Sequence, residues 1–160
     1  MALAELSNVL WRERELLEML LFKLESEQLV LAAGRTRWLA RSSREVELVL
    51  EEIRRTELLR TAELHAAAGE LGVGEAPRLR ELVEVVEEPW KAIFAGHREA
   101  FVAMTAEIGQ LAESNRELLS MGARSTYEAL LAVGGGVETY SSRGASGANG
   151  TRAATLDQVL

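Results

Sequence analysis

The chain has 160 residues, of which 48% are hydrophobic and 27% charged, with two prolines and no cysteine. This composition is typical of long helices, and the lack of cysteine excludes disulfides, thiol catalysis and cysteine-based zinc sites. The formal net charge is −7 and basic residues are interleaved with acidic ones, which argues against nucleic acid as a partner.

A leucine heptad predicts the first helix. Positions a of this heptad are taken by Leu3, Leu10, Leu17, Leu24 and Leu31, and Leu6 and Leu20 stand at d. Glu13 and Glu27 occupy d positions where leucine is expected. Two interpretations remain open for them: they reach solvent from the edge of the seam, or they weaken or register the helix pairing.

Gly34 suits the C-cap of this helix, and Thr36 can cap a second helix that runs to about Ala68. The two helices are expected to form an antiparallel hairpin, each about 45 Å long at 1.5 Å per residue. The next break follows at residues 69–77, which contain three glycines and a proline, and residues 78–86 predict a short connecting helix.

A third long helix is predicted from Pro89 onward. Mostly apolar residues recur there at alternating spacings of four and three, and such residues form one seam along a helix. Its members are Trp90, Phe94, His97, Phe101, Met104, Ile108, Leu111, Asn115, Leu118, Gly122 and Ser125. The last of these are small or polar, which predicts incomplete packing at that end. We therefore expect an all-α fold: an elongated antiparallel helical hairpin or coiled-coil bundle of three long helices in a domain 1–133, followed by a flexible glycine-rich tail, 134–160.

No residue pattern indicates catalysis. Neither His65 nor His97 has a glutamate three residues before it, as the di-iron helical bundles require, and no phosphate-binding loop or catalytic triad is recognisable. We expect no catalytic residue, no metal and no cofactor, and hence no enzyme. The N-terminus lacks the features of a signal peptide and no apolar run is long enough to span a membrane, so we expect a cytoplasmic protein that does not insert into membranes.

Four segments carry a resemblance to a known family. The segment Leu24 to Leu31, Trp90-Lys91-Ala92-Ile93, Asn115 with Leu118-Leu119, and Tyr140 to Gly144 occur in this order along the chain. In that order they resemble the FlgN family of flagellar type III export chaperones. The chain departs from the family pattern near Asn115, where Ala112 and Arg116 replace a second asparagine and a glycine.

The resemblance implies a cytoplasmic chaperone that binds the C-terminal helical segment of flagellar hook-associated junction proteins of the FlgK and FlgL type. It also implies delivery of these clients to the type III export gate at the inner face of the cytoplasmic membrane. A client helix is expected to fill the under-packed seam in the helix-in-groove mode. The expected client-binding residues are Leu111, Asn115, Leu118, Leu119, Tyr127, Leu130 and Leu131.

Three alternatives remain open from the sequence. The same residues can instead close the chaperone's own bundle or a homodimer. Tyr140, which the resemblance marks as the gate-binding residue, can fold back on the bundle. A structural coiled-coil adaptor unrelated to secretion has an equally good leucine seam.

Overall fold

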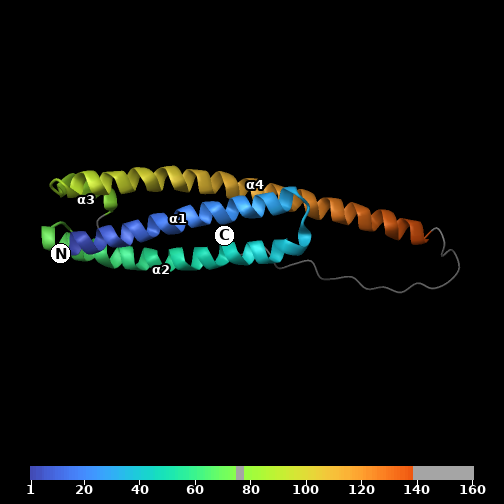
Figure 1. Ribbon diagram of the computed structural model, residues 1–160, viewed down its shortest axis with the longest axis horizontal. Coiled ribbons are helices and arrows are strands. Elements are labelled where there is room, and N and C mark those ends of the chain that lie inside the picture. Colours follow the sequence, from blue (N-terminus) through green and yellow to red (C-terminus); the bar gives the residue numbers. More distant parts are fainter. Residues whose placement is uncertain (75–77, 139–160) are drawn as a thin grey trace. The chain divides into compact units, whose positions relative to one another are not determined.

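The computed structural model describes residues 1–74 and 78–138, and every regular element in these ranges is helical (Figure 1). The elements are α1 (Ala2–Ala32), a 3-10 turn η1 (Thr36–Trp38), α2 (Leu39–Leu71), α3 (Leu79–Val85) and α4 (Trp90–Glu138). Residues Met1–Gly122 form one compact unit, and a second unit begins at Ala123. The predicted all-α fold with three long helices is confirmed.

Glycines end α1 and α2 in the same way. Gly34 has a φ of 64° and Gly72 a φ of 65°, a left-handed conformation that is least costly for glycine. At the end of α1, the Arg35 N–H donates to the carbonyl of Val30 at 3.0 Å. At the end of α2, the Val73 N–H donates to the carbonyl of Ala68 at 3.0 Å. Both are Schellman motifs, which satisfy carbonyls that a helix end leaves free, so the prediction for Gly34 is confirmed.

Thr36 does not cap α2, and that prediction is wrong. The Trp38 N–H donates to the carbonyl of Arg35 at 2.9 Å, which closes a 3-10 turn over Thr36 to Trp38. Helix α2 therefore begins three residues later than Thr36, and no side chain caps its first turn. Thr36 therefore lies in the connection between α1 and α2 and not at the first residue of α2.

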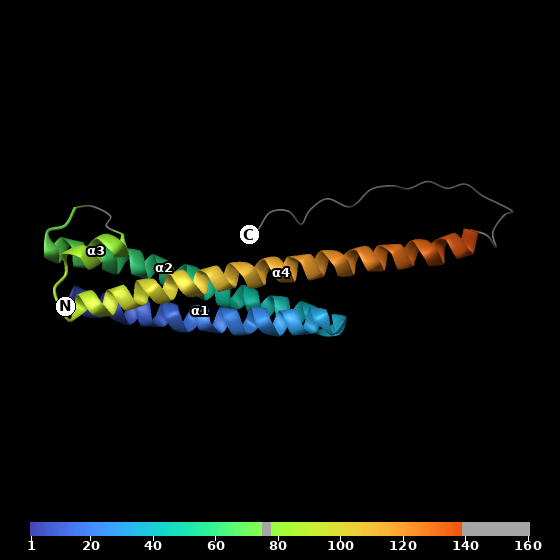
Figure 2. The same cartoon turned by 90° about the horizontal axis from the view of Figure 1, so that it is seen from above.

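Side-chain contacts fix the directions of the three long helices within Met1–Gly122. Between α1 and α2, contacts run from Ala2 with Glu70 at the open end to Glu27 with Ser43 near the hairpin turn, so these helices are antiparallel. Contacts between α1 and α4 advance together along both chains, from Trp11 with His97 to Leu24 with Asn115. Helix α4 is therefore parallel to α1 over this part of its length, as Figure 2 shows.

Two apolar clusters form the core of this unit. The first lies at the end where the chain begins and contains Ala2, Leu6, Leu10, Leu64, Ala67, Leu82, Val86 and Phe94. The second lies toward the hairpin turn and contains Leu16, Leu17, Leu20, Leu24, Val46, Val49 and Ile53. Phe101 of α4 packs against both clusters. The heptad leucines of α1 thus face α2 and α4 together, which is why the apolar stripe of α1 is wider than a two-stranded seam.

Glu13 and Glu27 do not reach solvent. Their side chains are buried at the d positions of α1, and each has a partner on α2. Glu13 accepts a hydrogen bond from Arg60 at 2.7 Å, and Glu27 accepts one from the Ser43 hydroxyl at 2.7 Å. Of the two interpretations of these residues, solvation at the seam edge is wrong.

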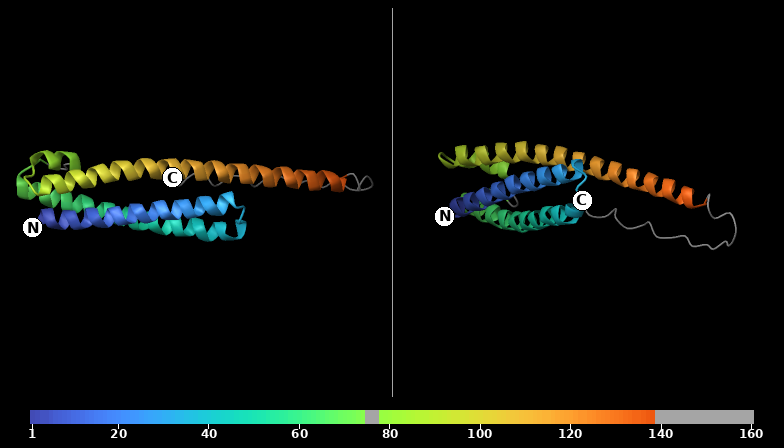
Figure 3. Two further views of the ribbon diagram at one scale, coloured as in Figure 1. Left: turned by 45° about the horizontal axis from the view of Figure 1, so that its top comes forward. Right: turned by 45° about the vertical axis from the view of Figure 1, so that its right-hand side comes forward.

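The short helix α3 is anchored in the first cluster by Leu82 and Val86. Figure 3 shows it at the end of the unit where α2 ends and α4 begins. Helix α4 starts at Trp90, directly after a cis bond between Glu88 and Pro89, and continues past Gly134 to Glu138. The proposed boundary between residues 133 and 134 thus falls inside α4, and residues 139–160 lie outside the described part of the chain. No helix in the described part is long and apolar enough to cross a membrane.

Candidate functional site

The residues expected to bind a client all lie on α4, but in different surroundings. Asn115 is buried, Leu111 and Leu118 are half-buried, and Leu119 is 40% exposed. Tyr127, Leu130 and Leu131 follow in the second unit, with exposed fractions of 63%, 65% and 57%. The two groups therefore differ in their packing.

Asn115 belongs to a polar layer that joins all three long helices. Its Nδ2 donates to the Leu24 carbonyl at 2.9 Å and to Oε2 of Glu27 at 3.3 Å. The other oxygen of Glu27 accepts from Ser43 of α2, and beside this layer Gln28 donates to Ser114 at 2.9 Å. The buried Oδ1 of Asn115 has no hydrogen-bond partner among the described residues. The amide of Asn115 thus holds α4 against α1.

The apolar residues around this layer are divided between core and surface. Leu111 packs against the second core cluster, and Leu118 is only partly covered. From Leu119 to Gly134 every residue is exposed. Packing of α4 within the compact unit therefore becomes incomplete one turn after Asn115.

The second unit contributes an exposed apolar face. Tyr127, Leu130 and Leu131 stand at spacings of three and four, so they share one side of a helix. In the heptad that puts Asn115 at a and Leu118 at d, they fall at f, b and c, whereas Gly122 and Ser125 take the next a and d positions. The apolar face of the second unit is therefore not a continuation of the seam register. Val133 of the second unit is exposed by 68% and Met121, near the end of the first unit, by 62%, and neither was expected from the sequence. Their hydrophobicity was visible, but neither fits the heptad.

The buried titratable groups serve the packing of the bundle. Burial lowers the pKa of His97, helped by the positive charge of Arg14, and in the part of the chain that the structure describes neither ring nitrogen has a hydrogen-bond partner. The edge of its ring meets the Trp11 ring, with centroids 4.7 Å apart. Burial also raises the pKa of Glu13, although the Arg60 guanidinium beside it acts in the opposite direction. His97 lies in the seam on the aromatic side chains of α1 and α4.

The described residues contain no group of three or more histidine, aspartate or glutamate side chains that could hold a metal ion. Tyr140, the expected gate-binding residue, lies outside the described residues. What the structure does present is a well-packed helical unit whose last helix extends into a row of uncovered apolar side chains. Exposed apolar surface of this kind is typical of helical proteins that bind other proteins.

Comparison with known proteins extends this class to a family. The family described as FlgN protein matches residues 1–148, which is most of the chain. The chain belongs to the FlgN family, and its general role is that of a chaperone in flagellum biogenesis. The comparisons with curated proteins and with solved structures gave no match.

Proposed function

We propose that this chaperone binds the C-terminal helical segment of hook-associated junction proteins of the FlgK and FlgL type through α4. The observation that carries the proposal is the row of Tyr127, Leu130 and Leu131, each more than half exposed and all on one side of the helix. A client helix that brings its own apolar face would remove this surface from water, at about 25 cal/mol for each Å² of apolar surface buried. The function is then binding and not catalysis.

In this proposal the residues around Asn115 take a different part. Asn115 and Leu111 hold α4 on the bundle, so their contribution to client binding is to position the helix. Leu118 and Leu119 lie where packing of the compact unit becomes incomplete, and they are the residues of that unit that we assign to client contact. A second copy of the chain could bind the same residues and form a homodimer. A client would then have to displace this second copy.

We further propose that the chaperone delivers its client to the export gate at the inner face of the cytoplasmic membrane, with Tyr140 as the contact. The support is the family membership and the position of Tyr140 outside the bundle sequence pattern. An aromatic residue in a glycine-rich segment can bury a large area in a partner while ordering few residues.

Tyr140→Ala is expected to weaken binding to the gate's cytoplasmic domain without changing client affinity or the melting temperature.

The client surface is tested by Leu130→Asp combined with Leu131→Asp. Both side chains are more than half exposed, so the substitution leaves the fold intact. Two charges placed in an apolar contact cost several kcal/mol, and we expect client affinity to fall at least 100-fold in a titration with the client's C-terminal peptide.

The matched control is Leu48→Asp with Leu58→Asp, which changes two leucines of α2 that are exposed by 51% and 74%. This variant is expected to bind the client with unchanged affinity. Equal loss in both variants, or unchanged binding in the α4 variant, would sink the assignment of the client surface. The oligomeric state without client tests the homodimer. A dimeric parent chain and a monomeric α4 variant would favour the homodimer as the use of this surface.

A further inference from the structure

A second surface lies at the other end of the compact unit, where α2, α3 and α4 meet. A groove of about 460 Å³ is lined there by Arg60, Thr61, Leu64, His65, Arg78, Leu79, Arg80, Arg98, Phe101 and Val102. Four of these described lining residues are arginines and none is acidic, although the chain as a whole carries a net charge of −7. The groove therefore concentrates positive charge on an acidic protein.

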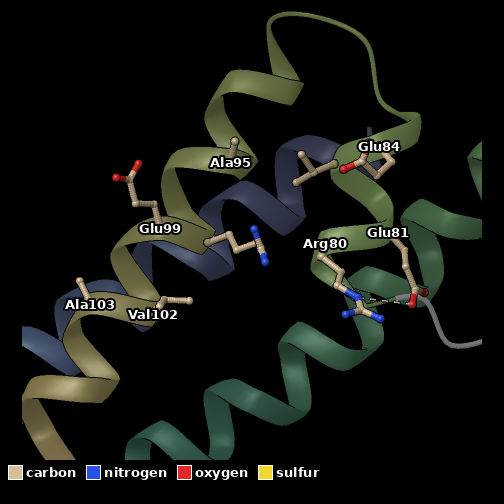
Figure 4. A pocket seen from close by; sticks show the side chains of 9 residues that line it. Arg80, Glu81, Glu84, Ala95, Glu99, Val102 and Ala103 are labelled. Carbon is tan, nitrogen blue, oxygen red and sulfur yellow. Dashed lines mark ion pairs between the residues drawn. The ribbon is translucent and has the colours of Figure 1, made fainter.

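A larger groove of about 800 Å³ adjoins it and shares Arg80, Arg98 and Val102. Figure 4 shows its two walls, with Arg80, Glu81 and Glu84 on α3 and Ala95, Glu99 and Val102 on α4. The Val102 side chain points toward α3, whereas the Glu99 carboxylate points away from it. Glu81 is engaged locally, since it accepts from the Arg78 N–H at 3.1 Å and lies 3.9 Å from Arg80.

The four guanidinium groups differ in how far their charge is already balanced. Arg60 is paired with the buried Glu13, and Arg80 lies near Glu81. Arg78 and Arg98 are exposed and have no ion pair with any described residue. The groove is also lined by four apolar side chains, which we call its floor: Leu64, Leu79, Phe101 and Val102, the last exposed by 63%. Helix α3 is fixed in the core by Leu82, so the groove exists before any ligand binds.

We propose that this groove binds an acidic, amphipathic peptide segment of a partner protein. Carboxylates of the peptide pair with Arg78 and Arg98, because guanidinium groups bind carboxylates through paired, charge-assisted hydrogen bonds. A large apolar side chain between the carboxylates covers Val102 and Phe101. A free inorganic anion would use the charges and leave the apolar floor uncovered, so the floor favours a peptide. The groove is separate from the client surface on α4, and the two are lined by different residues.

The experiment selects ligands without assuming a partner. A phage library of random 12-residue peptides is selected on the full chain and counter-selected on the variant Arg78→Glu with Arg98→Glu. We expect the enriched peptides to carry two or more aspartates or glutamates around a leucine or phenylalanine. A titration of the best peptide should show at least tenfold weaker binding to the variant, and weaker binding in higher salt.

The matched control is Arg44→Glu with Arg54→Glu, which changes the net charge equally on an exposed part of α2 outside the groove. This control should bind the selected peptide within about twofold of the parent chain. Val102→Asp should weaken binding as the double arginine variant does, and the client's C-terminal peptide should bind all of these variants normally.

Four results would overturn the proposal. The first is selection of peptides that lack acidic residues, and the second is an equal loss of peptide affinity in the control variant. The third is that inorganic phosphate displaces the selected peptide as readily as a version in which its apolar residues are replaced by alanine. The fourth is loss of client binding in the variant Arg78→Glu with Arg98→Glu. The fourth result would make the groove part of the client site. It would overturn a separate peptide site but leave the proposed client-binding function standing.

Discussion

His97 shows how one side chain of the seam sets a pH dependence. The unfolded chain binds a proton at this residue near the ordinary pKa of 6.5, whereas burial lowers the pKa in the folded protein. Because the unfolded state then binds more protons, the free energy of unfolding falls as the pH drops below about 6.5. We expect His97→Leu to raise the free energy of unfolding by roughly 1–3 kcal/mol at pH 7, since it removes two unpaired ring nitrogens from the interior.

Urea unfolding between pH 5 and 8 measures both effects of this substitution. The Leu variant should lack the loss of stability that the parent chain shows on acidification. His65→Leu is the control, because His65 is exposed and its ring nitrogen contacts only the Thr61 carbonyl of its own helix. An unchanged pH profile in His97→Leu would contradict the assignment.

The charge of the buried Glu27 can be tested through its neighbour Asn115. Asn115→Asp keeps the shape of the side chain but removes the donor to Leu24 and places a second carboxylate about where Nδ2 lies, 3.3 Å from Glu27. We expect a loss of about 3 kcal/mol at pH 7, because two like charges share a buried site. Burial beside a like charge is expected to raise the pKa of the introduced aspartate above its value in the unfolded chain, so stability should partly recover at pH 5.

Thermal unfolding at pH 5 and pH 7 distinguishes this effect from simple loss of a hydrogen bond. The matched control is Asn8→Asp on the exposed side of α1, which should change the melting temperature little at either pH. Equal destabilisation of Asn115→Asp at both pH values would mean that the charge of Glu27 plays no part.

At the scale of the helices, the heptad pattern predicted which side of α1 and α4 faces inward, and Gly34 predicted where α1 ends. It could not predict the partners of polar residues in the seam. Glu13 was compatible with a solvated position, and only the approach of Arg60, from 47 residues further along the chain, makes its burial possible. The sequence indicates that Tyr127 and Leu130 are apolar, and counting heptads places them outside the seam register, but their exposure depends on which neighbours are present and could not be predicted.

The pairing of α1 with α2 through Glu13 and Arg60 leads to a double-mutant test. Arg60→Met leaves a buried carboxylate without its counter-charge, and we expect a loss of about 3 kcal/mol. Adding Glu13→Leu should restore most of the stability, because an apolar pair of similar size needs no compensation. Unfolding free energies of the two single variants and the double variant give the coupling. A double variant as unstable as Arg60→Met would show that the charge pair is not the cause.

For the whole molecule, the division at Gly122 predicts separable folding and binding. A chain ending at Gly122 keeps both core clusters and the polar layer at Asn115, so its free energy of unfolding should lie within about 1 kcal/mol of the full chain. It lacks Tyr127, Leu130 and Leu131 and should lose most of its client affinity. Circular dichroism with urea and a client titration measure the two properties. Unfolding of the shortened chain would contradict the independence of the compact unit.

The continuity of α4 across Gly122 has a consequence for helix–coil equilibrium. Starting a helix in water is unfavourable by a factor of about 10⁻³, whereas each added residue costs little. The exposed turns beyond Gly122 extend a helix whose first turns are already held by packing, so they need no nucleation step of their own. How far the helix propagates then depends on local composition, and each glycine among Gly134, Gly135 and Gly136 opposes it by about 1 kcal/mol relative to alanine. These three glycines oppose propagation of the helix, so substitutions at these positions should lengthen or shorten the helical segment that follows Gly122.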